Sequence, residues 1–397
     1  MPPAHHRTAR RHRHHRPGER QVATRYTVVT VSDATWWIVG AIAAIAVLVG
    51  GIALWRGSRT PEGAMVRRRL LGRPHRDSFR PHPPELPALK RAVIVVNPSK
   101  VNDLGTVELL LTEICRESGW DTPTFLETTV EEPGTAQARQ AVADGADVVC
   151  ALGGDGTIRA VATGLVGSGI PLGVLPGGTG NLLARNLLLR APAAPVPTLE
   201  QAMRIALTGR NTAIDLGCVA IERPGTDEPE QEHFLVMAGF GADSSVMNDA
   251  DPKLKRQIGT GAYVVAGLRN MYGPQFKIRV SIDGGLEFSR RTRSMLIGNC
   301  GRLFGGLDLM PDAKLDDGRL DAVILSPKGV VGWAAVAASA ATRHRQGHAL
   351  MDRHTGARMR ARADRPEPIQ LDGEVMGVAI GLTAWVQPRA LVVRVPQ

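Results

Sequence analysis

Three glycines surround one carboxylate in the stretch from Leu152 to Ala160, LGGDGTIRA. Gly153, Gly154 and Gly156 allow backbone N–H groups to approach an anion closely, and a helix that begins here adds the positive end of its dipole. A carboxylate repels phosphate, so Asp155 indicates a metal ligand, a contact to a substrate hydroxyl or a residue that orders the turn. A strand-to-helix turn with an Asp N-cap would also explain this stretch on its own.

A second glycine stretch, Gly173 to Asn181 (GVLPGGTGN), likewise follows a short apolar run and precedes a predicted helix. Two such loops in an alternating strand and helix pattern are a more specific signal than one, because a single glycine motif is weak. The pair therefore indicates a phosphate-binding region.

Two acidic stretches late in the chain could supply the remaining chemistry. Pro311 to Asp321 holds four carboxylates, and a tight turn of this kind offers carboxylate and carbonyl oxygens to a hard cation. Leu371 to Glu374, LDGE, brings two further carboxylates together. A polar β-turn and a hairpin turn are the respective alternatives.

The elements that must position these loops alternate between strand and helix. Strands are predicted at 91–97, up to 126 and at 147–151, and helices at 106–118, 135–143, 157–165 and 182–189. This alternation predicts a parallel α/β sheet, in which ligands bind at the carboxyl ends of the strands. We therefore expect one crevice to hold Asn97, Thr129, Asp155 and Thr179.

The pattern changes after residue 210. Strands are predicted at 215–220, 233–239, 276–283 and 293–299, and Asp283-Gly284-Gly285 predicts a hairpin turn. This pattern predicts a mainly antiparallel second domain. Helices with one apolar face are predicted at 253–272 and 329–345; they would line an acyl pocket or simply belong to the core.

The 397 residues are enough for two domains, and their charge is unevenly distributed. Residues 1–90 carry 16 Lys and Arg against 5 Asp and Glu, a net charge of +11, whereas the remainder carries 32 against 33, a net charge of −1. A nucleic-acid-binding domain needs a basic face on its folded body, so we expect no nucleic-acid partner. Widely spaced cysteines in apolar surroundings are expected to be reduced core residues: Cys115, Cys150, Cys218 and Cys300.

The first 90 residues divide into three predicted segments. Residues 1–35 are basic and His-rich without periodicity, which predicts a disordered tail. Residues 36–55 are uncharged and apolar with tryptophans at both ends, which predicts one N-terminal transmembrane helix, a cleaved signal peptide being a minor alternative. Residues 56–90 are basic and Pro-rich, which predicts a stiff linker.

Arginines are more numerous just after residues 36–55 than just before them. Because positive charge stays on the cytoplasmic side, this asymmetry predicts a single-pass protein of the cell inner (cytoplasmic) membrane with a cytosolic catalytic body. Arg67, Arg68 and Arg69 are expected to attract anionic lipid head groups.

The combination of G-G-D-G-T at 153–157 with P-x-G-T-x-N at 176–181 resembles the diacylglycerol-kinase-type lipid kinases, which include the bacterial soluble diacylglycerol kinases and the sphingosine kinases. The resemblance covers the chain from about Ala92 onward. It implies an α/β catalytic domain with a parallel, NAD-kinase-like sheet at 91–210 and a lipid-substrate domain of β-sandwich type at 211–397. It also implies ATP-dependent transfer of phosphate, with Mg²⁺, to the hydroxyl of a membrane lipid, with diacylglycerol as the first choice.

The same resemblance implies roles for individual residues. Glu374 would be the proton acceptor, and Asp155 its catalytic partner through a magnesium ion or a hydrogen bond. A structural Mg²⁺ would be held by the Asp317 side chain and by main-chain oxygens of Lys314 and Arg319. The ATP site would comprise Asn97, Pro98, Ser99, Lys100, Thr129, Gly153, Gly154, Asp155, Gly156, Thr157, Arg159, Gly178, Thr179 and Asn181.

Two loops depart from the family pattern. The run from Asn97 to Lys100 lacks a glycine that commonly follows in relatives, so Lys100 would supply the positive charge there. Arg159-Ala160 stands where many relatives carry Asn-Glu, and we expect Arg159 to meet a phosphate.

Several alternatives stay open from the sequence. The acceptor could be a sphingoid base, a polyprenol or a glycolipid instead of diacylglycerol. An NAD-kinase-like enzyme would also carry G-G-D-G-T, and a catalytically weak lipid-binding regulatory protein would keep the fold, although the retention of Asp155, Asp317 and Glu374 argues against the latter. The absence of G-x-x-x-x-G-K-[ST] and of protein-kinase loops excludes those two routes to ATP. The oligomeric state, including a homodimer, is also open.

Overall fold

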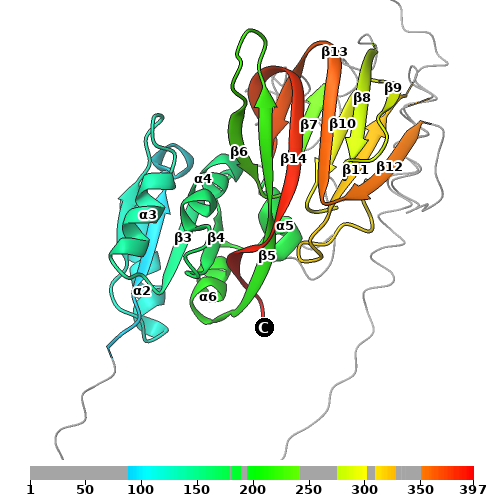
Figure 1. Ribbon diagram of the computed structural model, residues 1–397. Coiled ribbons are helices and arrows are strands. Elements are labelled where there is room, and N and C mark those ends of the chain that lie inside the picture. The colour runs from blue at the N-terminus through cyan, green and yellow to red at the C-terminus, as the bar shows by residue number, and fades with distance from the viewer. Residues whose placement is uncertain are drawn as a thin grey trace, which may run out of the picture. The chain divides into compact units, whose positions relative to one another are not determined.

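The computed structural model describes residues 88–178, 180–188, 195–241, 275–301, 309–327, 332, 336 and 350–397 (Figure 1). They lie within one compact unit, Phe79–Gln397. Several predicted features fall outside these ranges: the tail, the apolar run at 36–55, the linker, the arginines at 67–69, Thr179 and almost all of the helices predicted at 253–272 and 329–345.

The first part of the unit is a parallel α/β sheet, as the alternating pattern predicted. Its strands are β1 (Ala92–Val96), β2 (Thr124–Glu127), β3 (Val148–Gly153) and β4 (Leu172–Pro176), in the order β4-β3-β1-β2. Its helices are η1 (Pro98–Lys100), α2 (Leu104–Glu117), α3 (Thr135–Ala143), α4 (Asp155–Leu165), α5 (Leu182–Leu187) and α6 (Leu199–Thr208).

Helices cover both faces of this sheet, because successive side chains of a strand point to opposite faces. In β1, Val93 and Val95 pack with residues of α3 and α4, whereas Ile94 and Val96 pack with residues of α2 and α6. Helix α6, which the sequence analysis did not predict, begins at a capping box in which Thr198 and Gln201 satisfy each other's backbone N–H.

The second part is built almost entirely of antiparallel strands in the described ranges. These strands are β5 (Arg210–Glu222), β6 (Glu230–Phe234), β7 (Met237–Gly241), β8 (Phe276–Ile282), β9 (Phe288–Thr292), β10 (Ser294–Gly298), β11 (Leu320–Leu325), β12 (Met351–Gly356), β13 (Arg358–Leu371) and β14 (Glu374–Val395). The predicted hairpin turn joins β8 to β9, with Asp283 and Gly284 both at positive φ. Phe234, Phe240 and Ile278 belong to a fully buried core of this part.

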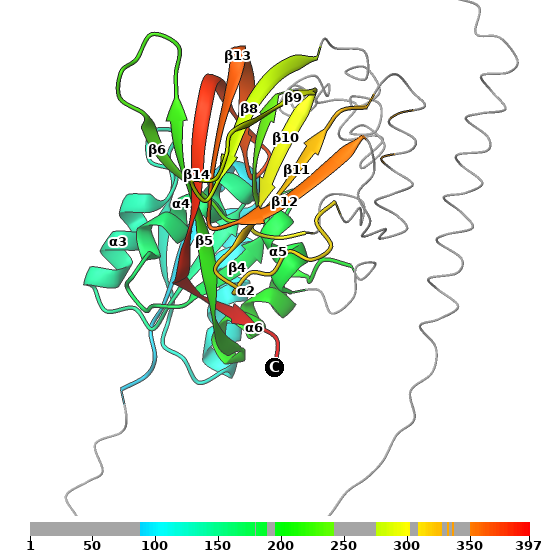
Figure 2. The ribbon, with the colours of Figure 1, turned by 45° about the vertical axis from the view of Figure 1, so that its right-hand side comes forward.

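Strand β14 joins the two parts. It pairs with β13 and β5 in the β-rich part, and near its end Val393 pairs in parallel with Leu172 of β4. Figure 2 shows β5 and β14 side by side, with the C-terminus close to α6. One continuous strand therefore fixes the start of the β13–β14 hairpin with respect to the parallel sheet.

The prediction of a single-pass protein of the inner membrane is contradicted. Across the ranges that the structure describes, no helix combines the length and the apolar character needed to cross a bilayer. A bilayer core requires about 20 apolar residues, and the longest of these helices, α2, has 14 residues with several charges among them.

Candidate active site

Two glycine loops meet backbone to backbone at the carboxyl edge of the parallel sheet. Gly153 ends β3 and Gly154 follows it, while Gly177 and Gly178 follow β4. The N–H of Gly177 donates to the carbonyl oxygen of Gly153 over 2.9 Å. A Cβ atom on Gly178 would lie only 2.8 Å from the Cα of Gly154, so this close approach requires glycine.

The loop after β1 lies beside these two. The N–H of Asn97 donates to the Leu152 carbonyl over 2.9 Å, and its side-chain amide donates to Thr157 Oγ1 over 3.2 Å. Its Oδ1 accepts the N–H of Ser99 and so begins the short helix η1. The Cε of Lys100, an exposed residue, lies 3.9 Å from the position that a Cβ on Gly154 would take. A positive charge therefore stands next to the glycine loop.

Asp155 connects the two glycine loops. It is the first residue of α4, and its Oδ1 accepts the N–H of Leu182 over 2.6 Å, so it caps α5 from the neighbouring loop. Burial, together with the nearby carboxylate of Asp372, raises the pKa of Asp155 to about 7. Asn181 takes a left-handed conformation and closes its own loop through hydrogen bonds with Gly178.

The β13–β14 hairpin brings two further carboxylates, Asp372 and Glu374, to this edge. Its two-residue turn consists of Asp372 and Gly373, both at positive φ, as the hairpin alternative for this run predicted. Asp372 is buried and accepts the N–H groups of Leu235, Val236 and Met237 over 2.8–3.0 Å. Burial raises its pKa, and the positive charge of Arg159 opposes that rise. Asp372 thus anchors the hairpin to the β6–β7 connection.

Glu374 lies against the first turn of α4. A Cβ atom on Gly156 would be 2.8 Å from Glu374 Oε2, which shows that the two residues are in direct contact. Oε2 also accepts from the Arg159 guanidinium over 2.5 Å. The Glu374 side chain remains 56% exposed, so it can be reached from solvent. The structure therefore places Glu374 against Gly156, the residue that follows Asp155.

The Arg159 guanidinium contacts two carboxylates, and its predicted contact with a phosphate stays a prediction. Arg159 is 9% exposed and lies 2.5 Å from Glu374 and 3.9 Å from Glu232 of β6. Its nitrogens also contact the Met376 sulfur at 3.8–3.9 Å. Arg159 thus links α4 to two strands of the β-rich part, β6 and β14.

One predicted nucleotide contact, Thr129, is engaged within a turn of its own. Thr129 holds its own turn, in which its N–H donates to the Glu132 carbonyl and its Oγ1 accepts the Glu132 N–H. Thr179 lies outside the described residues.

The acidic turn from Asp312 to Asp321 is organised around a buried carboxylate that the sequence analysis did not single out. Asp215 of β5 is fully buried, and its carboxylate accepts the N–H groups of Gly318 and Arg389 over 2.6 and 2.8 Å. Asp317 is exposed and accepts the Arg319 N–H over 3.1 Å, as in a polar turn. Within the described residues, no three His, Cys, Asp or Glu side chains form a cluster that could hold a metal ion. A site with one carboxylate and two carbonyls stays a prediction.

Asp372 and Glu232 are also parts of the site that sequence reasoning missed. The signal for Asp372 was its place in the two-residue hairpin turn before Glu374, although nothing in the sequence tells which N–H groups it accepts. Glu232 carried no signal, because its partner Arg159 lies on a distant helix.

Comparisons with known proteins agree over most of the described chain. Residues 91–219 match the diacylglycerol kinase catalytic domain, and residues 236–395 match the YegS C-terminal NAD kinase beta sandwich-like domain. The diacylglycerol kinase of Bacillus subtilis is 28% identical over 303 residues, which cover 74% of this chain and 92% of that protein. The diacylglycerol kinase of Staphylococcus aureus is 29% identical over 243 residues, which cover 59% and 70%.

The fold agrees with a solved structure as well. The crystal structure of a putative diacylglycerol kinase from Bacillus anthracis superposes with a TM-score of 0.62 at 20% identity, covering 79% of this chain and 97% of that one. At this identity the likeness describes the fold alone.

Proposed function

Since the chain belongs to the diacylglycerol-kinase-type lipid kinases, which are ATP-dependent enzymes, we propose that its acceptor is the free hydroxyl of diacylglycerol and its product phosphatidic acid. The observation that carries the proposal is the contact of Glu374 with the first turn of α4, directly beside Asp155 and the glycine loops. A carboxylate in that place can take the proton of an alcohol next to a bound phosphate chain.

The glycine loops hold the phosphates of ATP in this proposal. Gly153, Gly154 and Gly178 bring backbone close to backbone and leave no side chain between the loops. Their N–H groups, the start of α4 and the charge of Lys100 favour an anion at this edge. The side chains of Asn97 and Asn181 shape the loops through the hydrogen bonds described above.

Glu374 acts as the general base. The hydroxyl oxygen of the lipid attacks the γ-phosphorus, the new O–P bond forms, and the bond between the γ-phosphorus and the bridging oxygen breaks, so that ADP leaves. The hydroxyl proton passes to the Glu374 carboxylate. Arg159 holds Oε2, and in the described structure no hydrogen-bond partner lies on Oε1, which is therefore the oxygen that we assign to the proton.

Asp155 acts beside Glu374, through a magnesium ion or a hydrogen bond to the reacting groups. Its Oδ1 is engaged with the Leu182 N–H, so it also fixes the distance between the two glycine loops. A second Mg²⁺ would be structural and bound by Asp317 with the carbonyl oxygens of Lys314 and Arg319, a donor set of the hard oxygen type that this cation prefers. Magnesium bound with ATP would neutralise phosphate charge during the transfer.

The test is an assay with labelled ATP on diacylglycerol, a sphingoid base, a polyprenol, a glycolipid and NAD, each offered separately. We expect label in phosphatidic acid. The Glu374→Gln protein, compared under the same conditions, should lose turnover and keep ATP binding. Label in NAD alone, or in no substrate, would refute the proposal. If another lipid is labelled in preference to diacylglycerol, that lipid is the acceptor and the assignment of diacylglycerol is wrong.

A further inference from the structure

Strand β13 presents arginines at its first three outward positions. Met359, Ala361 and Ala363 are buried in the core of the β-rich part. The alternate residues Arg358, Arg360 and Arg362 are all exposed on the opposite face. This is the period-two pattern of a strand with one buried face, except that the outer positions all carry the same charge.

The neighbouring strands continue this charge. In the register of the sheet Arg362 lies opposite Arg279 of β8, and Lys277 of β8 lies opposite Arg291 of β9. Residues directly opposite each other in antiparallel strands share a face. Lys277, Arg279 and Arg291 are all exposed. Six basic side chains on three adjacent strands therefore form one surface, here called the basic face: Lys277, Arg279, Arg291, Arg358, Arg360 and Arg362.

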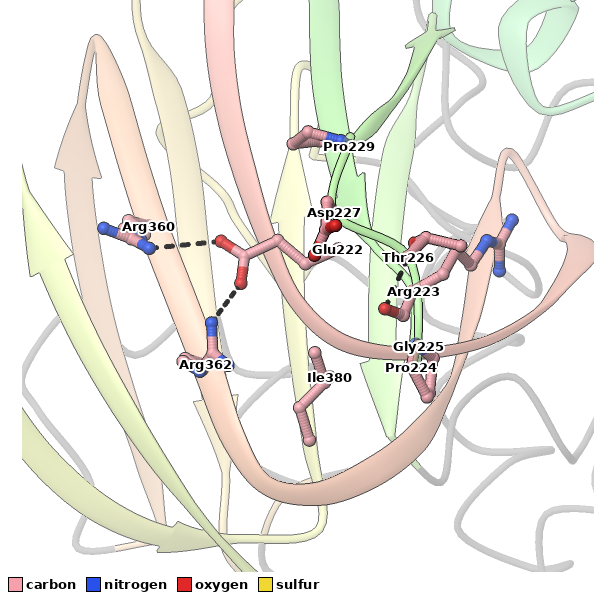
Figure 3. A pocket seen from close by; sticks show the side chains of 10 residues that line it. All are labelled: Glu222, Arg223, Pro224, Gly225, Thr226, Asp227, Pro229, Arg360, Arg362 and Ile380. Atoms are coloured by element: carbon pink, nitrogen blue, oxygen red, sulfur yellow. Dashed lines mark hydrogen bonds and ion pairs between the residues drawn. The ribbon is translucent and has the colours of Figure 1, made fainter.

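Few carboxylates neutralise the basic face. Glu222 of β5 accepts from both Arg360 and Arg362, over 3.2 and 2.5 Å, and Figure 3 shows it between them. Glu287 lies 3.6 Å from Arg279. Asp283 and Asp364 lie at the borders, where they accept backbone N–H groups. The six cations thus exceed the four carboxylates, although residues 91–397 together carry a net charge of −1.

A hollow of about 600 Å³ lies at the edge of the basic face, between β13 and the turn that follows β5 (Figure 3). Its lining includes Arg360, Arg362 and Arg223. The Arg223 guanidinium donates to the carbonyl oxygens of Met376 and Val378, in the strand that begins with Glu374. The strand that carries the proposed base, β14, therefore contacts this hollow and pairs directly with β13 of the basic face.

We propose that the basic face is a docking surface for an anionic lipid bilayer. An extended array of exposed guanidinium groups without a deep groove matches a broad layer of phosphate head groups, to which arginine binds with two parallel hydrogen bonds. Arg358 stacks over the ring of Trp385 with 5.6 Å to the centroid, and tryptophan is enriched where proteins meet the head-group layer. The choice of a bilayer over nucleic acid rests on the proposed function, because a lipid acceptor resides in a membrane.

The test compares two triple variants of the full chain in sedimentation with vesicles. One variant, Lys277→Gln, Arg279→Gln and Arg291→Gln, removes three charges of the basic face and leaves the Glu222 network intact. The matched control, Arg116→Gln, Arg139→Gln and Arg204→Gln, removes three exposed charges from helices of the α/β part. Both variants keep the same N-terminal residues, so any binding by that region is common to them.

Each basic side chain near an anionic bilayer strengthens binding by roughly fivefold. On vesicles of equal parts phosphatidylcholine and phosphatidylglycerol, we expect the face variant to bind at least tenfold more weakly than the control variant. On pure phosphatidylcholine both should bind weakly and alike. A further variant, Glu222→Gln with Arg360→Gln and Arg362→Gln, removes the paired network as a whole and should also weaken binding to the anionic vesicles.

Equal binding of face and control variants to the anionic vesicles would overturn the proposal, and so would tighter binding of the wild type to duplex DNA than to those vesicles at the same salt concentration. Turnover on diacylglycerol dispersed in neutral detergent separates this inference from the proposed reaction. The face variant should keep wild-type turnover there. A wild type that binds the anionic vesicles through the basic face but phosphorylates no lipid would refute only the proposed function.

Discussion

Gly156→Ala should damage catalysis without damaging the fold. The added methyl carbon would stand 2.8 Å from Glu374 Oε2, 3.4 Å from its Cδ and 3.5 Å from its Oε1. Gly156 lies in the first turn of α4 and is not among the positive-φ glycines of the described residues, so alanine fits its backbone conformation. The group that must give way is the end of a flexible side chain, which moves easily.

The size of the effect follows from that displacement. Ordinary van der Waals contact begins at 3.4 Å, so Oε2 has to retreat by about 0.6 Å. A misplacement of about 1 Å in a reacting group can cost about 10²-fold in rate, and a general base contributes about 10²- to 10⁴-fold in total. We therefore expect kcat to fall about 10- to 100-fold, which is about 1.4–2.7 kcal/mol in the barrier. Replacing glycine in a helix stabilises it by up to about 1 kcal/mol, so the Tm should not fall.

The assay is a double-mutant cycle on diacylglycerol with Glu374→Gln as the second change. If the methyl acts by displacing Glu374, Gly156→Ala should cost little more once the carboxylate is gone. Gly154→Ala is the matched control from the same loop, because its methyl meets nothing closer than 3.9 Å and does not contact Glu374. Any loss of activity caused by Gly154→Ala would come from altered ATP binding. That loss should add to the one caused by Glu374→Gln.

Two results would refute the reasoning. One is a Gly156→Ala protein with wild-type kcat, which would mean that Glu374 does not work from its position against α4. The other is full additivity with Glu374→Gln, which would trace the loss to ATP binding.

Further predictions concern individual charged groups. Glu374→Gln should lower kcat by about 10²- to 10⁴-fold with little change in ATP affinity, measured by equilibrium binding; near-full turnover would remove Glu374 from the reaction. Asp317→Ala should weaken the dependence of activity on Mg²⁺ in a folded protein, whereas an unchanged magnesium titration would exclude Asp317 from a metal site. Because burial raises the pKa of Asp155 to about 7, the native state binds its proton more tightly than the unfolded chain, so this group's stabilising contribution is full below about pH 4 and is lost as pH rises towards 7. The free energy of unfolding, measured by denaturant titration with a metal chelator present, should fall by up to about 4 kcal/mol over this pH range. Asp155→Asn should make that fall smaller. The same dependence on pH in both proteins would show that Asp155 is not the group responsible.

The α/β part could be predicted from the sequence because its signals are local. The spacing of apolar residues within each segment predicts the strand β1 and the helices α3 and α4. The loops after β3 and β4 are indicated by their clustered glycines. That Glu374 belongs with these loops came from the resemblance to a family. No periodicity in the chain relates residue 374 to residue 156.

The contacts within the site could not be predicted, since they join distant segments. Arg159 and Glu374 are 215 positions apart in the sequence, and the contact between them depends on how the β13–β14 hairpin meets α4. The contacts of Asp372 could not be predicted either. Its three N–H partners lie where β6 ends and β7 begins, a place that the sequence pattern predicted as one strand at 233–239.

The charge count misled in one respect. A sum over residues 91–397 is close to zero, and that near-neutrality argued against any basic surface. Arg358, Arg360 and Arg362 stand at alternate positions between apolar residues, so the sequence did contain a signal for a charged sheet face. The net charge of a domain cannot detect such a face, because it does not record that alternate residues of a strand lie on the same side of the sheet.

The span of β14 has a consequence for the order in which the enzyme is made. Every other described element is translated before this strand, and both Glu374 and the pairing of Val393 with Leu172 belong to it. On the ribosome, the proposed ATP-binding loops can therefore fold while Glu374, the proposed base, has not yet been synthesised. Contacts of such long sequence separation also form slowly. A nascent chain should hence acquire nucleotide binding first and phosphoryl transfer only after its last strand has emerged from the exit tunnel.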